Sequence, residues 1–173
     1  MRKNAVVEAL EEIVGTDAIE YISGEVLDVG TESCHLSEKR GSVYGIAIKV
    51  EKQSDRTEIM KKLKDSMGKR IGGVGDWKPI RGNYYPLYCG KDINMGIRLH
   101  SHTKSMKSTG TLQLNSVDKN ALENYRIIYG ALPCINFEAH EEELHAEYPD
   151  LLKTKKSKGE DQIKMEDFNP DED

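Results

Sequence analysis

A run of alternating side chains between residues 42 and 50 constrains the fold more than any other segment. Alternate positions place one aromatic and three aliphatic side chains on the same side of an extended chain, namely Tyr44, Ile46, Ile48 and Val50. The other side receives Val43, Ala47 and Lys49. This period of two predicts a β-strand in which Tyr44 points the same way as an apolar row.

Helical patterns precede and follow this strand in the sequence. Residues 5 to 14 carry apolar side chains at helical spacing, with Asn4 as an expected N-cap and Gly15 as the stop. A lysine-rich helix is expected from Ser54 to Met67, ended by Gly68. The weaker alternation over residues 24 to 37 fits one or two further strands.

The second half of the chain begins with a short strand, Tyr84–Gly90, that closes on a glycine turn. Asp92 is expected to cap a helix that runs through Ile97 to His102. A helix capped by Ser116 is predicted over residues 117 to 129, and an amphipathic stretch over 137 to 148. These elements predict one α/β (α+β) domain over residues 1–150, followed by a charged tail over 151–173.

The net charge of −5 hides an uneven distribution. Residues 1 to 38 hold 2 basic and 9 acidic side chains, whereas residues 39 to 107 hold 16 basic and 6 acidic ones. Duplex DNA carries about one negative charge per 1.7 Å of axis, so a basic segment matters more for binding than the total charge. Composition therefore does not exclude a nucleic-acid partner.

Cysteine usage and hydropathy predict a cytoplasmic, non-secreted protein. The three cysteines have no paired spacing, and no apolar run approaches the ~20 residues that a membrane span needs. Cys89 is expected to be a buried thiol without a catalytic role, because neither a histidine nor a second cysteine adjoins it in sequence.

The strand and helix between residues 84 and 102 bring together groups that suit phosphate chemistry. Tyr88 and Lys91 end the strand, and Arg98 and His102 share one helix face four residues apart. An arginine can hold a phosphate with its planar fork, while a tyrosine or histidine can transfer the proton of an attacking water. Which of Tyr44 and His102 takes the proton stays open at this point.

In order and spacing, these residues resemble the GIY-YIG nuclease superfamily, whose pattern covers residues 43 to 136. The resemblance implies a small, mainly antiparallel three-stranded sheet flanked by helices, with Tyr44 and Tyr88 on adjacent strands facing Arg98, His102 and Glu123. It implies that Glu123 is the metal ligand for one Mg²⁺ (or Mn²⁺) ion per site. Asn136 would anchor the site, and Lys91 would lower the pKa of Tyr44.

An insertion at about residues 51–83 separates the two motif strands and is similar to that of the type II restriction endonuclease branch. The resemblance thus implies sequence-specific hydrolysis of double-stranded DNA, by a homodimer on its target. The alternatives are a less specific repair, recombination or phage nuclease, and a non-catalytic DNA-binding module. Six basic residues are candidates for DNA contact: Lys69, Arg70, Lys78, Arg81, Lys104 and Lys107. Taken singly, the tyrosines also fit strand aromatics that pack a sheet.

Overall fold

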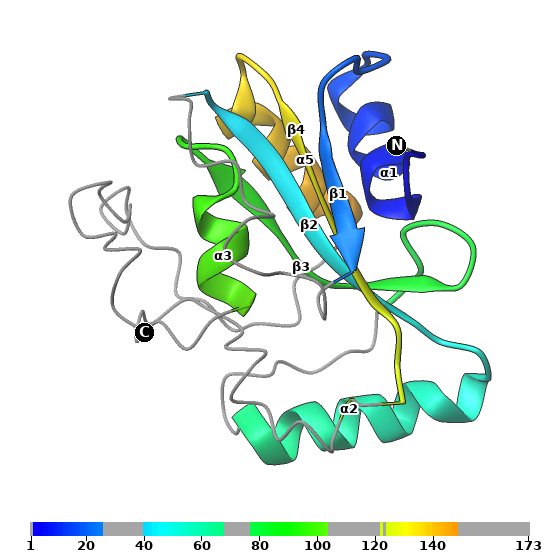
Figure 1. The fold of residues 1–173 in the computed structure, drawn as a ribbon. Helices are drawn as coiled ribbons and strands as arrows, with labels where there is room; N and C mark the ends of the chain where they lie inside the picture. The colour runs from blue at the N-terminus through cyan, green and yellow to red at the C-terminus, as the bar shows by residue number, and fades with distance from the viewer. Residues whose placement is uncertain (1, 26–39, 68–76, 104–121, 123, 149–173) are drawn as a thin grey trace.

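A four-stranded antiparallel sheet forms the centre of the computed structural model, which describes residues 2–25, 40–67, 77–103, 122 and 124–148 (Figure 1). The strands are β1 (Ile22–Glu25), β2 (Ser42–Lys49), β3 (Tyr84–Asp92) and β4 (Ile127–Pro133), in the spatial order β1-β4-β2-β3. The expected α+β class and antiparallel pairing are confirmed. The sheet has four strands instead of the expected three, because β1 pairs with β4 at one edge.

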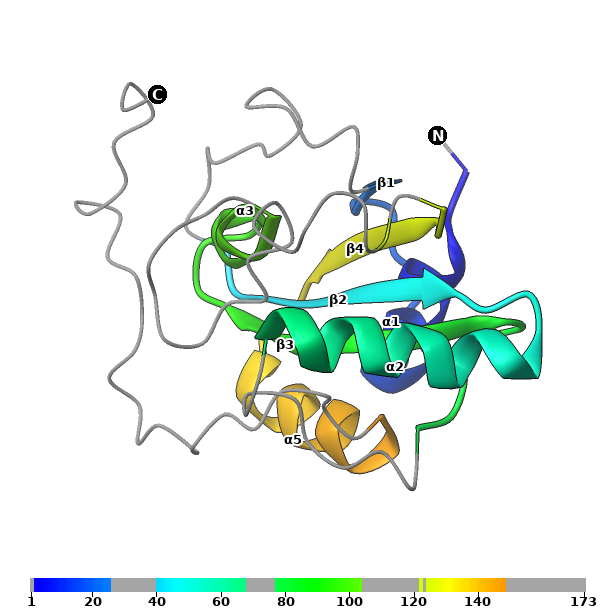
Figure 2. The ribbon, with the colours of Figure 1, turned by 90° about the horizontal axis from the view of Figure 1, so that it is seen from below.

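Helices cover both faces of the sheet. They are α1 (Ala5–Val14), α2 (Gln53–Met67), α3 (Ile97–Thr103) and α5 (Phe137–Glu147). Figure 2 shows α3 on one side of the sheet and α5 on the other. Within the described ranges, no helix combines the length and the apolar character that crossing a membrane requires.

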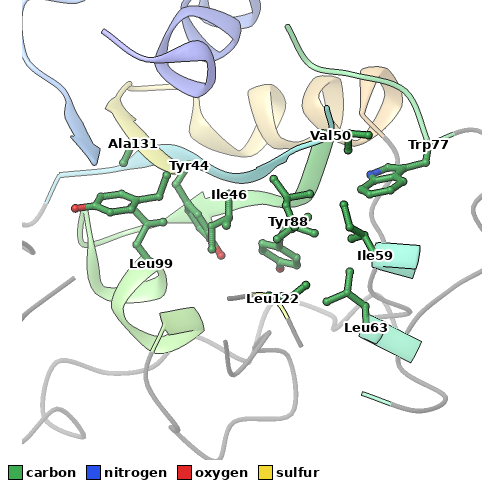
Figure 3. Packing of buried hydrophobic residues seen from close by; sticks show 13 residues of the cluster. Tyr44, Ile46, Val50, Ile59, Leu63, Trp77, Tyr88, Leu99, Leu122 and Ala131 are labelled. Carbon is green, nitrogen blue, oxygen red and sulfur yellow. The ribbon is translucent and has the colours of Figure 1, made fainter. Parts of the chain in front are cut away.

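The alternation in β2 divides the hydrophobic core in two, as predicted. Tyr44, Ile46, Ile48 and Val50 pack with Ile59 and Leu63 of α2 and with Trp77 (Figure 3). On the opposite face, Val43 and Ala47 pack with residues of α1 and α5. Cys89 is buried on this second face, in agreement with the packing role predicted for its thiol.

The inserted segment packs back onto the strand that follows it. The indole N–H of Trp77 donates to the carbonyl of Pro86 in β3, with an N···O distance of 2.7 Å. The Arg56 side chain of α2 lies over the rings of Trp77 and Tyr85 and donates to the Trp77 carbonyl. These contacts attach α2 to the sheet beside the hydrophobic residues that pack around Tyr44.

The prediction of a helix through residues 117 to 129 is wrong at its C-terminal end. Residues 127 to 133 form β4, which lies between β1 and β2. A strand buried on both faces is a continuous apolar run, and such a run satisfies helical spacing as well as strand spacing. Leu122 is helical, whereas residues 116 to 121 and 123 lie outside the described residues.

The Asn4 side chain caps the first turn of α1 and also joins this helix to the sheet. Its side-chain oxygen accepts from the backbone N–H groups of Val6 and Val7, each at 3.1 Å, which confirms the predicted N-cap. Its side-chain amide donates to the carbonyl of Tyr129 in β4 at 2.8 Å. One side chain therefore starts the helix and connects it to a central strand.

We expect Asn4→Ala to lower the free energy of unfolding by about 1 to 2 kcal/mol, because it removes the cap and the side-chain donor to the Tyr129 carbonyl. Urea unfolding monitored by circular dichroism measures the change. Asn4→Asp is the matched control, since a carboxylate keeps the cap but cannot donate to Tyr129. An Asn4→Ala protein as stable as the wild type would contradict this role.

Candidate functional site

Tyr44, Tyr88, Arg98 and His102 come together on the face of the sheet that carries α3. Tyr44 lies on β2 and Tyr88 on the neighbouring β3, as predicted. The ring centroids of Tyr44 and Tyr88 are 5.9 Å apart, and the His102 ring lies 5.7 Å from Tyr44 and 4.3 Å from Tyr88. These four residues are called the tyrosine cluster below.

Gly90 makes room for the Tyr44 side chain. It pairs with Tyr44 across the β2–β3 ladder. A Cβ atom at this position would lie 3.1 Å from the Tyr44 hydroxyl oxygen and 3.0 Å from the Tyr88 ring. The glycine that ends the sequence motif therefore lets the Tyr44 phenol lie across β3 toward α3.

A hydrogen bond of 2.9 Å joins the Tyr44 hydroxyl to Nε2 of His102. Burial, and then the charge of Arg98, lower the pKa of His102 to about 3, so its ring is neutral at pH 7. Burial raises the pKa of Tyr44 well above its ordinary value, with a smaller contribution from Tyr88 and an opposing one from Arg98. In the tautomer that carries its hydrogen on Nδ1, the neutral His102 ring accepts this bond at Nε2 and the Tyr44 hydroxyl donates it.

Arg98 supplies the positive charge of the cluster. Its guanidinium hydrogen-bonds the side chains of Tyr44 and Tyr88. Burial lowers the pKa of Arg98, but the two phenol oxygens raise it more, so the net shift is upward and the group stays charged. Arg98 is half-buried, whereas Tyr44 is 1% and His102 0% exposed.

Asp92 holds α3 in a different way from the one predicted. It belongs to β3, and α3 begins five residues later, at Ile97. Its carboxylate nevertheless accepts from the backbone N–H of Arg98 at 2.7 Å and from that of Asn94 at 3.1 Å. Burial raises the pKa of Asp92 to about 6, although these backbone bonds oppose the shift. The sequence showed a capping residue here, but not its burial beside the cluster.

Lys91 and Asn136 are not brought to the tyrosine cluster. Lys91 pairs with Val43, which places its side chain on the opposite face of the sheet from Tyr44. There its ammonium lies 3.3 Å from a carboxylate oxygen of Glu138 and 3.5 Å from one of Glu141, both on α5. Asn136 is exposed at the N-terminus of α5 and makes no side-chain capping bond.

Glu123, the predicted metal ligand, lies outside the described residues. Its neighbour Leu122 is buried in the same hydrophobic cluster as Tyr44 and Tyr88 (Figure 3). Within the described part of the chain, no group of three or more histidine, cysteine, aspartate or glutamate side chains is placed to hold a metal ion.

Two of the six basic residues proposed for DNA contact lie within the described ranges, and both are engaged elsewhere. Lys78 forms an ion pair of 3.1 Å with Glu147 of α5. Arg81 pairs with Glu8 at 2.8 Å and with Glu12, both on α1. These partners belong to the helices that cover the face opposite the tyrosine cluster. Lys69, Arg70, Lys104 and Lys107 lie outside the described residues.

Comparisons of the chain with protein-family models, with curated proteins and with solved structures found no match.

Proposed function

We propose that this protein is a Mg²⁺-dependent endonuclease that hydrolyses phosphodiester bonds in double-stranded DNA at a short recognition sequence, as type II restriction enzymes do. The observation that supports it best is the hydrogen bond between Tyr44 and a neutral His102 beside the guanidinium of Arg98. Burying such polar groups costs free energy that apolar side chains would avoid. Their arrangement provides a proton path and a phosphate-binding charge in one place.

In this proposal, Arg98 binds the scissile phosphate. A phosphate that approaches this face meets Arg98 first, because Tyr44 and His102 lie almost fully buried. The planar guanidinium can donate two parallel hydrogen bonds to non-bridging oxygens and oppose the charge that grows on them. The two tyrosine hydroxyls hold the guanidinium side chain before substrate arrives.

Tyr44 then passes a proton from the attacking water to His102. The Tyr44 oxygen accepts the water proton while its own proton moves to Nε2 of His102, so no free phenolate has to form. In this route no free phenolate of Tyr44 has to form, although burial and the charge of Arg98 also oppose protonation of His102, so the transfer would be concerted with attack on phosphorus. Of the two residues that the sequence left open, we propose His102 as the acceptor of this proton, because its Nε2 lies 2.9 Å from the Tyr44 hydroxyl.

The metal ion would rest on Glu123. Asp92 is unsuited to this task because both of its oxygens already accept backbone N–H groups. A single carboxylate with water completing the shell is a mode that Mg²⁺ tolerates. Bound there, the ion would stabilise the charge on the departing oxygen.

In a homodimer on DNA, we do not expect the two sheets to pair through β3, one of the two edge strands. Side chains of α5 already occupy backbone groups of this strand. Glu141 accepts from the N–H of Lys91 at 3.1 Å, and Nε2 of His145 lies 2.8 Å from the carbonyl of Cys89. Edge strands whose backbone groups are covered resist pairing with another sheet.

One observation favours a second candidate, a DNA-binding module without catalysis on the same scaffold. The exposed fractions of Tyr44 and His102, 1% and 0%, are also those of core residues. In that case the cluster would serve packing, and Arg98 would contact phosphate without a chemical step.

Incubation of the purified protein with unmethylated plasmid and Mg²⁺ separates these functions. We expect discrete fragments from the wild type and none from Glu123→Ala. A smear would mean a nuclease without sequence specificity. DNA binding without cleavage under Mg²⁺ or Mn²⁺ would contradict the enzyme and support the binding module.

A further inference from the structure

Asp92 is the one acidic side chain that is buried within the described residues, at 6% exposed. It lies at the end of β3, opposite Ser42 of β2, on the strand that also carries Tyr88. An ionised carboxylate buried without compensation would be strongly destabilising, so its partners indicate what it does. Those partners are the backbone N–H groups of Asn94, before α3, and of Arg98, in its first turn, and, through space, the charge of Arg98.

We infer that Asp92 is a positioning residue for Arg98: its carboxylate fixes the amino end of α3 so that the guanidinium meets the two tyrosine hydroxyls. This inference rests on the proposed function, in which Arg98 binds the scissile phosphate. It assigns to Asp92 a task that neither the motif spacing nor the predicted N-cap contained.

The short length of α3 is the first reason for this assignment. The helix has 7 residues, and helices of that length are not stable by themselves. Its first N–H groups have no partner within the helix, and Asp92 satisfies the one at Arg98. The bond therefore acts on the same residue whose side chain enters the cluster.

The segment that connects β3 to α3 is the second reason. Asp92 also accepts from the N–H of Asn94, and the Asn94 carbonyl accepts from Ile97 at 3.1 Å. Gly96, with φ of 99°, completes the turn in a conformation that other residues rarely adopt. Ile97 and Leu99 anchor the apolar side of α3, whereas Asp92 fixes its polar start.

The charge of Asp92 also faces that of Arg98. The guanidinium favours the ionised carboxylate, and the carboxylate raises the pKa of Tyr44 further. With its own pKa at about 6, Asp92 is mostly ionised at pH 7.5. It thus contributes a backbone bond and a counter-charge to the same arginine.

The first test requires no activity: amide hydrogen exchange at Arg98, followed by NMR. We expect exchange about ten-fold faster in Asp92→Ala, because the N–H loses its acceptor, and an intermediate rate in Asp92→Asn, which keeps one acceptor oxygen. Ser42→Ala is the matched control: it removes a buried hydroxyl that donates to the backbone carbonyl of Asp92 at 3.5 Å, keeps the Asp92 carboxylate, and should leave Arg98 exchange unchanged. Equal protection of Arg98 in the wild type and in both Asp92 variants would overturn the inference, and Asp92→Asn keeps the test decisive if Asp92→Ala does not fold.

The second test is a double-mutant cycle on plasmid cleavage. If Asp92 acts through Arg98, Asp92→Ala should reduce cleavage about ten-fold in the wild type and have no further effect in Arg98→Ala. Independent, multiplicative losses would mean that Asp92 only supports the fold and would overturn the positioning role. A wild type that cleaves no DNA would contradict the proposed function instead, and the exchange at Arg98 would then decide the role of Asp92.

Discussion

Tyr44→Phe is expected to reduce DNA cleavage by about 10² to 10⁴-fold while leaving DNA affinity unchanged, because a positioned proton-transfer group contributes about this much. The phenyl ring fills the same space beside Tyr88 but cannot pass a proton to His102. Single-turnover cleavage of a plasmid substrate measures the chemical step, and gel-shift titration without metal ion measures binding. Unchanged turnover would remove Tyr44 from the mechanism.

The same substitution has a cost in stability that must be separated from its cost in catalysis. Nε2 of His102 would lose its donor in a buried site, which lowers the free energy of unfolding by about 1 to 3 kcal/mol. Tyr85→Phe is the matched control: it lies on the same strand, but contacts Trp77 and Arg56 instead of His102. It should cleave at the wild-type rate.

The sequence predicted β2 and α1 correctly because each of their patterns had a single interpretation. The alternation around Tyr44 fits only a strand, and the Asn4 and Gly15 boundaries define α1 at both ends. The prediction for residues 127 to 133 was wrong because an apolar run without alternation fits a buried strand and a helix alike. The position of β1 at the edge of the sheet could not be predicted, because it depends on pairing with β4, which is distant in sequence.

Local spacing along the chain predicted some residues of the site, but not those whose position depends on how the elements pack. Arg98 and His102 are four residues apart on a helix, so their common face could be predicted locally. Lys91 was assigned from its place after a glycine, but strand alternation directs its side chain away from Tyr44. The burial of Asp92 depends on how α3 packs on the sheet, which sequence spacing cannot report.

Arg98→Lys is expected to lower cleavage by about 10² to 10³-fold, the usual effect of removing one preorganised donor to a developing negative charge. A lysine keeps the charge but not the planar fork that two tyrosine hydroxyls and a phosphate can share. Arg56→Lys is the matched control, because Arg56 is also held against aromatic rings but lies on α2, outside the tyrosine cluster. It should retain turnover.

Arg98→Ala gives a further result that does not depend on catalysis. The charge of Arg98 lowers the pKa of His102, so its removal should raise that pKa from about 3. Burial is the larger cause and persists, so the pKa should stay below the ordinary value of about 6.5. NMR titration of the His102 ring measures the shift. An unchanged pKa would mean that the guanidinium does not act on this histidine, and Arg98 would then bind phosphate without tuning the proton acceptor.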